Sequence, residues 1–311
     1  MRNRFSVRRA VQVAAVGAVF CLAAIPMAGQ QVPANGLFPA YRAPRFPGTN
    51  NPDLNGIWEA LSTANWDVLT HEASPGPHPE LMGEYSAGPA GQGIVEGNEL
   101  PYRPEALEKK KKNFANRMTA VPPGPYEFVT GELPPTGEPE LKCWMPGIPR
   151  MIYMPFPFQI VQTPDFVLMT TEYNVSSRII RMNWKEEAPI DSFMGWARGH
   201  WEGETLVVDV TGFNDQTWFD RAGDFHSDAL HVVERYTALS PYHLQYEATI
   251  DDPKVFTRPW KMSFILYRRV EKNMQLMEFK CQPFVEELLF GKYNKQPSKC
   301  AVISSQLLAF S

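Results

Sequence analysis

The chain has 311 residues, 44% of them hydrophobic and 12% aromatic, so it can bury a large core in one or two domains. Acidic residues outnumber basic ones by 34 to 30, and four of the basic residues are arginines within the first nine positions. The remainder of the chain is therefore clearly acidic, which argues against nucleic acid as a partner.

Residues 1–29 have the layout of a secretory signal peptide. The arginines are followed by an apolar run from Val11 to Met27, broken by one glutamine, and then by the small residues Ala28 and Gly29. The run is short for a transmembrane helix. We therefore expect a secreted or periplasmic protein of a Gram-negative type of bacterium, with no stable membrane span once the leader is cleaved. The choice between Sec and Tat export stays open.

Three cysteines follow the leader, namely Cys143, Cys281 and Cys300. In an oxidising compartment this odd number predicts one disulfide and one free thiol. Cys143–Cys281 is favoured, because it would staple the N-terminal half onto the strand region, and Cys143–Cys300 is the competing pair. The cysteine and histidine spacings are not those of a zinc site. We expect no metal and no cofactor.

The N-terminal half is rich in proline, because 22 of the 29 prolines precede Phe158. Such a sequence cannot be regular sheet or helix throughout. We expect an extended arm over residues 30–52. Over residues 53–157 we expect a first strand, proline-rich loops and one helix that wrap a barrel. Pro104 suits the first turn of that helix, which should run to about Met118.

From residue 158 to 282 the turn signals become regular and predict an antiparallel barrel core. Pairs such as Pro164-Asp165 and Glu202-Gly203 separate short alternating segments. The expected strands are Phe158–Thr163, Phe166–Tyr173, Ser177–Asn183, Trp196–Trp201, Glu204–Thr211, Leu230–Thr237, Tyr242–Ile250, Pro259–Arg269 and Met274–Cys281. Closing this meander removes its exposed edges. We therefore predict a mainly β, antiparallel up-and-down barrel with one or two short helices and a C-terminal tail over residues 283–311. A two-layer sandwich is the alternative.

Alternation along one strand places a carboxylate inside this barrel. Glu234 shares a face with Leu230, Val232 and Tyr236. A buried carboxylate costs several kcal/mol unless another group pairs with it or a reaction uses it. Arg268, on the inner face of a late strand, is the expected countercharge. The pattern predicts either a structural ion pair or a polar anchor or general acid/base in a pocket.

The segment from Gly212 to Asp228 is long for a hairpin loop and is rich in aromatic and ionisable side chains. Its only histidine, His226, is a candidate base whose ring Asp215 or Asp220 could orient. Alternatively, the polar side chains merely satisfy turn backbone. The candidate catalytic residues are His226, Glu234, Asp215 and Asp220, and the candidate ligand-binding residues are Trp201, Trp218, Arg235, Tyr236, Tyr246, Trp260 and Arg268.

Gly56-Ile-Trp58 resembles the G-x-W sequence of lipocalins and related calycin barrels. In that family the tryptophan closes one barrel end beneath an arginine from a late strand. The resemblance would give this role to Arg268 or Arg269, which competes with the pairing of Arg268 to Glu234. Gly199-His-Trp201 matches the same pattern.

A second resemblance, over roughly Asn51 to Pro283, is to a large family of uncharacterised secreted bacterial proteins. It is carried by the runs Cys143-Trp-Met-Pro-Gly-Ile-Pro-Arg150, Gly199-His-Trp-Glu-Gly-Glu-Thr-Leu-Val-Val-Asp209, Gly212-Phe-Asn-Asp215, His226-Ser227, His231-Val-Val-Glu-Arg235 and Asp251-Asp-Pro. Trp144 and Met145 stand where the usual form has leucine and proline, and Asp224-Phe225 replaces a short proline-containing step. The resemblance implies a shared arrangement of loop and strand, without a named activity.

These features predict a secreted barrel that binds a small hydrophobic or aromatic molecule in its mouth. Glu234 and Arg268 would be the interior anchors, and the Gly212–Asp228 loop would be the lid. One alternative is a small-molecule hydrolase, lyase or isomerase in which His226 and Glu234 exchange protons with the substrate. Another is an envelope protein-protein interaction module that uses the aromatic arm from Phe38 to Phe46. The sequence does not specify an oligomeric state.

Overall fold

The computed structural model describes residues 41–76, 87–117 and 137–282, all of which belong to one unit, Pro33–Ser311. The expected leader, the beginning of the arm, the C-terminal tail and Cys300 lie outside the described residues.

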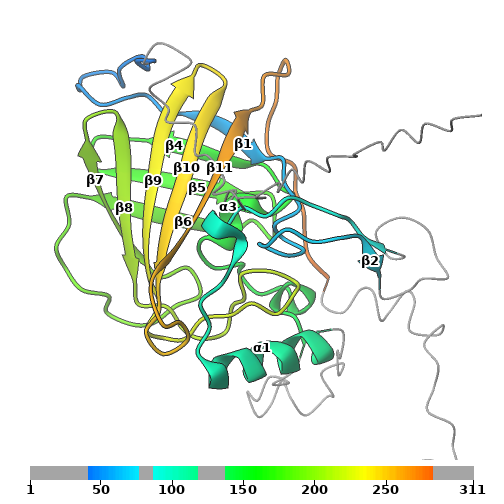
Figure 1. Ribbon diagram of the computed structural model, residues 1–311. Helices are drawn as coiled ribbons and strands as arrows, with labels where there is room; N and C mark the ends of the chain where they lie inside the picture. Colours follow the sequence, from blue (N-terminus) through cyan, green and yellow to red (C-terminus); the bar gives the residue numbers. More distant parts are fainter. Residues whose placement is uncertain (1–40, 77–86, 118–136, 283–311) are drawn as a thin grey trace, which may run out of the picture. The chain divides into compact units, whose positions relative to one another are not determined.

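Nine strands close into a barrel (Figure 1). In barrel order the strands are β1 (Gly56–Ala60), β11 (Trp260–Arg268), β10 (His243–Asp251), β9 (His231–Ser240), β8 (Thr205–Thr211), β7 (Trp196–Glu202), β6 (Ser177–Met182), β5 (Phe166–Thr171) and β4 (Phe158–Gln162). β4 pairs with β1 and closes the ring. The predicted mainly β barrel is confirmed, and its strands lie close to the expected ranges.

The barrel follows from alternation in the sequence. Along β10 every second side chain is buried, so Leu244, Tyr246, Ala248 and Ile250 are at most 1% exposed while their neighbours are only partly covered. A shift of one residue in register would move all four side chains to solvent, so burial fixes the pairing of β10 with β9 and β11.

Two expectations for the strands are wrong. β6 and β7 pair in parallel, over Ile180–Met182 and Ala197–Gly199, so the barrel is mostly rather than wholly antiparallel. The segment connecting β6 and β7, residues 183–195, is long enough for the chain to return to the end where β6 began. Met274–Cys281 forms no strand. Within it Phe279 makes one isolated bridge to Tyr173.

Each barrel end is closed by side chains. At one end the short helix α3 (Arg150–Tyr153) is fully buried, and the Tyr153 hydroxyl donates to the carbonyl of Phe219 at 2.7 Å. At the other end the guanidinium of Arg268 lies 4.3 Å from the ring centroid of Trp58 and donates to the carbonyl of Asn55 at 2.7 Å. Arg268, rather than Arg269, is therefore the arginine that lies over Trp58.

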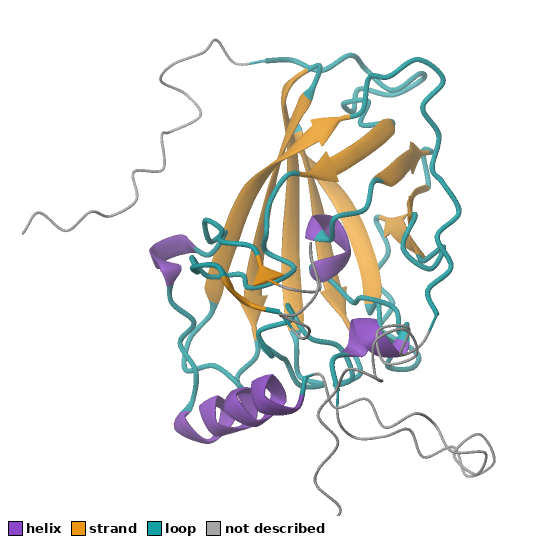
Figure 2. Ribbon diagram, turned by 90° about the vertical axis from the view of Figure 1, so that its right-hand side faces the viewer, coloured by secondary structure: helices purple, strands orange, loops and turns teal. Residues whose placement is uncertain are grey.

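The N-terminal half wraps this barrel. It contains the short strands β2 (Ser74–Pro75) and β3 (Ala87–Gly88), the single-turn helices η2 (Glu96–Asn98) and η3 (Pro139–Lys142), and α1 (Pro104–Asn116). In Figures 1 and 2 α1 lies below the lower end of the barrel. There the Asn113 amide donates to the Gly223 carbonyl at 3.2 Å, which joins α1 to the β8–β9 loop.

A salt bridge and a disulfide also join the N-terminal half to later parts of the chain. In the arm, Arg45 pairs with Glu204 in the β7–β8 turn, at 2.6 Å. Cys143 and Cys281 form a disulfide, as the sequence favoured, and it joins positions 138 residues apart. This bond is compatible with an extracellular or periplasmic location. Within the described ranges, no helix has the length and apolar character needed to cross a membrane.

Candidate functional site

Glu234 lies in the barrel interior, as alternation predicted, with no exposed surface. Its partner is Arg178 on β6 rather than Arg268. The guanidinium donates to both carboxylate oxygens, at 2.8 and 3.1 Å. The hydroxyls of Tyr236 and Tyr246 donate to Oε1 at 2.8 and 2.9 Å. The acid is thus held by four donors from three strands, in the arrangement that makes a buried ion pair tolerable.

The surroundings of this ion pair are packed by side chains. Tyr236 and Tyr246 meet edge to face at 5.0 Å, and Tyr246 packs against Phe264 at 4.9 Å. Burial raises the pKa of both tyrosines well above the ordinary value, so their hydroxyls stay protonated and donate to Glu234. A carboxylate already holding four hydrogen bonds is poorly placed to exchange a proton with a substrate.

His226 is also buried, at 1% exposure, but in the β8–β9 loop. Its Nδ1 lies 2.9 Å from the Ser227 carbonyl and its Nε2 lies 2.6 Å from the Thr217 hydroxyl. A carbonyl only accepts, so Nδ1 carries the proton and Nε2 accepts from Thr217. Desolvation lowers the pKa of His226. The ring is therefore a neutral packing element between Phe213 and Phe219.

We expect the two histidines of the H-S and H-V-V-E-R runs to titrate on opposite sides of the ordinary value of 6.5. Burial lowers the pKa of His226, whereas a hydrogen bond to Asp209, 2.7 Å from Nε2, raises the pKa of His231. An NMR titration of the imidazole carbons, assigned with His231→Gln, measures both values. If His226 titrated at or above 6.5, its assignment as a buried neutral ring would be wrong.

Neither aspartate proposed to orient His226 does so. Asp215 is exposed, and Asp220 is buried with its oxygens accepting from the backbone N–H groups of Val68 at 2.9 Å and Asp224 at 3.1 Å. Burial and then the charge of Asp224 raise the pKa of Asp220 well above its usual range. Asp220 thus anchors the N-terminal wrap to the β8–β9 loop.

Three carboxylates meet at this point, because oxygens of Asp67, Asp220 and Asp224 lie within 4.8 Å of one another. Hard cations favour such oxygen sets. Here the Lys110 ammonium of α1 lies 3.5 Å from Asp224 Oδ2, and the Tyr102 hydroxyl donates to Oδ1 at 2.8 Å. We therefore interpret the group as a lysine-compensated acid cluster that fastens α1 to the loop.

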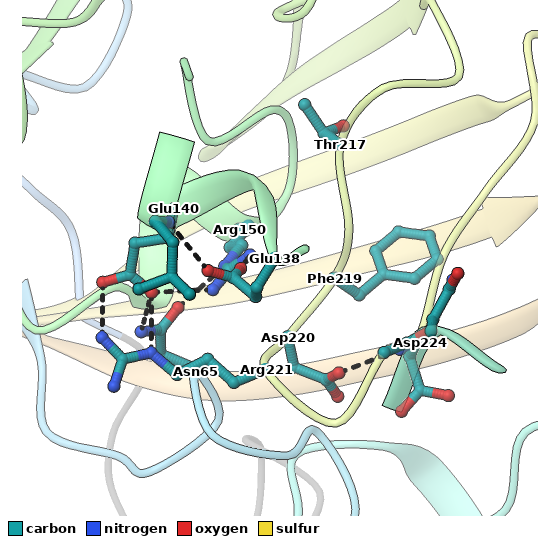
Figure 3. A network of polar contacts seen from close by, with 12 residues as sticks. Asn65, Glu138, Glu140, Arg150, Thr217, Phe219, Asp220, Arg221 and Asp224 are labelled. Atoms are coloured by element: carbon teal, nitrogen blue, oxygen red, sulfur yellow. Dashed lines mark hydrogen bonds and ion pairs between the residues drawn. The ribbon is translucent and has the colours of Figure 1, made fainter. Parts of the chain in front are cut away.

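A second charged cluster lies beside it (Figure 3). Arg150 of α3, 2% exposed, donates to Glu138, to Glu140 at 2.9 Å and to Asn65 at 2.8 Å. The guanidinium of Arg221 also donates to both carboxylate oxygens of Glu140, at 2.7 and 2.8 Å. Burial alone would raise the pKa of Glu140, but the two guanidinium groups outweigh it and lower the pKa to about 2.

One opening in the barrel wall leads toward Arg178. N-terminal to their three-pair parallel ladder, β6 and β7 separate and leave a cavity of about 390 Å³, which we call the β6–β7 slot. Arg178 lines the slot, as does Arg181 of the same strand. The apolar part of its wall is formed by Met145, Ile179, Phe193, Met194, Trp196 and Ala197.

A further pocket, of about 270 Å³, lies outside the barrel beside the second charged cluster. Trp66, His71 and Phe114 line it. Gly76 and Arg117, also in its wall, directly precede the segments 77–86 and 118–136, which lie outside the described residues. The slot, in contrast, is lined entirely from within the continuous range 137–282.

The remaining predicted ligand-binding residues are scattered. Arg235 is on the outer barrel face, opposite to the face of Glu234, and pairs with Glu202 at 2.9 Å. Trp260 is 3% exposed and packs edge to face against Phe219 at 5.5 Å. Trp201 and Trp218 are partly buried against the core. Trp196 is the only tryptophan among the lining residues of the slot, and the sequence did not single it out as a ligand contact.

No protein-family model and no curated protein matches this sequence significantly. The site must therefore be interpreted from its own geometry. Its most important residue, Arg178, was missed although alternation places it on the inner face of β6 with Ile180 and Met182. The roles of Glu138, Glu140 and Arg150 depend on contacts between distant segments.

Proposed function

We propose that this protein is exported from the cytoplasm and binds a small, largely apolar molecule in the β6–β7 slot. The observation that carries the proposal is the composition of the slot, whose apolar and aromatic walls surround a buried arginine. Small-molecule sites are typically concave, mostly apolar and equipped with a few polar groups that orient the ligand, and about 390 Å³ lies within their usual range.

The slot also has the rigidity that a binding site needs. Arg178 is fixed by its two hydrogen bonds to Glu234, and that acid is held in turn by two tyrosines. On the other wall Phe193 packs against Trp144 with ring centroids 5.5 Å apart. A preorganised wall lowers the entropy that binding costs. Glu234 keeps the anchoring role expected from the sequence, but it acts through Arg178.

The β8–β9 loop is not assigned the role of a lid in this proposal. Phe213, Phe219, Asp220 and His226 of this loop are at most 1% exposed, and each has contacts that fix it against the barrel end or the N-terminal wrap. The loop supports the barrel from below, while the slot opens through the wall at the β6–β7 connection.

Fluorescence titration with the uncharged probe N-phenyl-1-naphthylamine tests the proposal. Phe193→Ser should weaken binding about tenfold or more, because the ligand would lose its contact with an aromatic side chain, and full burial of such a side chain is worth about 1.5–3 kcal/mol. Ile190→Ser is the matched control: it changes an apolar residue of the same connecting segment that is 77% exposed and outside the slot. Equal losses in both variants, or no binding by the native protein, would overturn the proposal. Native mass spectrometry of the purified protein adds a search for a retained ligand.

A further inference from the structure

We propose that the ligand of the slot is an amphipathic anion, with an apolar body and a single acidic group such as a carboxylate. This inference rests on the proposed function and adds the charge of the ligand. It starts from the charges in the lining, which includes Arg178 and Arg181 and, among the described residues, no aspartate or glutamate.

Arg181 provides the accessible positive charge. It lies half-buried at the outer rim of the slot, with its guanidinium 4.5 Å from the ring centroid of Trp184 and 5.8 Å from that of Trp196. These rings hold the cation in place without neutralising it. Across the ranges that the structure describes, no carboxylate oxygen lies within ion-pair distance, 4.0 Å, of this guanidinium.

Three other arginines of the barrel are paired with carboxylates. Arg198, opposite Arg181 in the parallel ladder, contacts Asp209 at 2.5 Å, and Arg235 of β9 contacts Glu202 at 2.9 Å. Arg269, directly after β11, contacts Glu59 at 2.7 Å. Arg181 differs from these arginines, and it lies at the rim of the apolar slot, where an anionic ligand would supply a partner for it.

Two donors at the slot favour an acceptor in the ligand. The two terminal nitrogens of the Arg178 guanidinium donate to Glu234. The Nε–H of Arg178 is buried without a hydrogen-bond partner. The indole N–H of Trp196 is likewise buried without one. Unsatisfied buried donors cost free energy, and oxygens of an acidic ligand group could relieve that cost. First contact would be with Arg181, because its guanidinium lies at the rim.

A matched pair of probes separates charge from apolar burial. 8-Anilino-1-naphthalenesulfonate has the same ring system as N-phenyl-1-naphthylamine and adds one sulfonate. We expect the native protein to bind the sulfonate about tenfold more tightly, as a charge-assisted contact predicts. Rising salt should reduce this preference and leave the neutral probe unaffected. In competition, decanoate should displace the sulfonate at lower concentration than 1-decanol or decylamine.

Arg181→Gln should abolish the preference for the sulfonate while the neutral probe keeps its affinity. Arg258→Gln is the control, since Arg258 is an exposed arginine outside the slot, and it should leave both affinities unchanged. If the neutral probe binds as proposed but the sulfonate gains nothing, or if Arg181→Gln leaves that gain intact, the anion inference fails and the proposed function stands. If Phe193→Ser affects neither probe, the slot itself is the wrong site.

Discussion

Glu234→Gln is expected to lower the free energy of unfolding by about 3–5 kcal/mol, the usual cost of breaking a buried ion pair by removing one partner. Glutamine keeps the size of the side chain, but it leaves the guanidinium of Arg178, itself 5% exposed, without a countercharge. It also replaces one oxygen of the carboxylate group that accepts hydrogen bonds from Arg178, Tyr236 and Tyr246 with an NH2 group, which cannot accept them. Urea denaturation followed by circular dichroism measures the loss.

Two further variants isolate the cause. Glu247→Gln removes a carboxylate from the outer face of β10, opposite Arg235, and should cost less than about 1 kcal/mol. The double variant Arg178→Met, Glu234→Leu removes both charges and should recover much of the stability lost in Glu234→Gln. A Glu234→Gln protein as stable as Glu247→Gln would show that the pair is not essential to the barrel.

The same ion pair shows how far alternation reaches. The alternation of apolar and polar residues along the strands predicts that Glu234, Tyr236 and Tyr246 face the barrel interior. All three lie there without exposed surface. The countercharge was assigned to the wrong strand, because alternation orders residues within a strand but does not say which strands face each other across the interior. Arg178 and Arg268 both satisfied the pattern. In the structure Arg178 donates to Glu234, whereas Arg268 stacks on Trp58.

The parallel pairing of β6 and β7 could not be read from turn chemistry. Local signals identify a two-residue hairpin, as at Glu202-Gly203, but a connection of thirteen residues is compatible with either direction. This pairing matters for function, since the strands separate beyond three residue pairs and form the slot. The least predictable feature of the barrel is thus the one that makes its candidate site.

The β8–β9 loop gives the opposite lesson. Its mixture of aromatic and ionisable side chains suggested a binding loop, but Asp220 reaches the Val68 backbone and Arg221 reaches Glu140. These partners lie 152 and 81 residues away. Composition indicates that a loop is fixed by polar contacts or used for binding, and it cannot distinguish the two without knowing which segments fold beside it.

Arg150→Met should have an effect as large as Glu234→Gln, about 3–5 kcal/mol, because it leaves two buried carboxylates with fewer cations. Glu140 keeps Arg221, but Glu138 loses the arginine that donates to it. Burial already raises the pKa of Glu138 against the opposing charge of Arg150, and removing that charge should raise the pKa further. Thermal and urea unfolding at several pH values measure the change.

The pH dependence gives this variant a signature. When the pKa of a carboxyl group is higher in the folded protein than in the unfolded chain, where it is about 4.3, the protein becomes less stable as pH rises from the lower value to the higher one. The loss of stability in Arg150→Met relative to the native protein should therefore grow from pH 4.5 to 8. Glu140 acts in the opposite sense. Its folded pKa of about 2 stabilises the protein above pH 4.5, and this contribution is lost as pH falls toward 2. A deficit that grows as pH rises is therefore the signature of a carboxyl group whose folded pKa is raised, as expected for Glu138.

Arg45→Met, which breaks the half-exposed pair with Glu204, is the control and should have only a small effect on the free energy of unfolding. A deficit in Arg150→Met that equals the one in Arg45→Met, or that stays constant across pH, would contradict the assignment of Arg150 as the central countercharge.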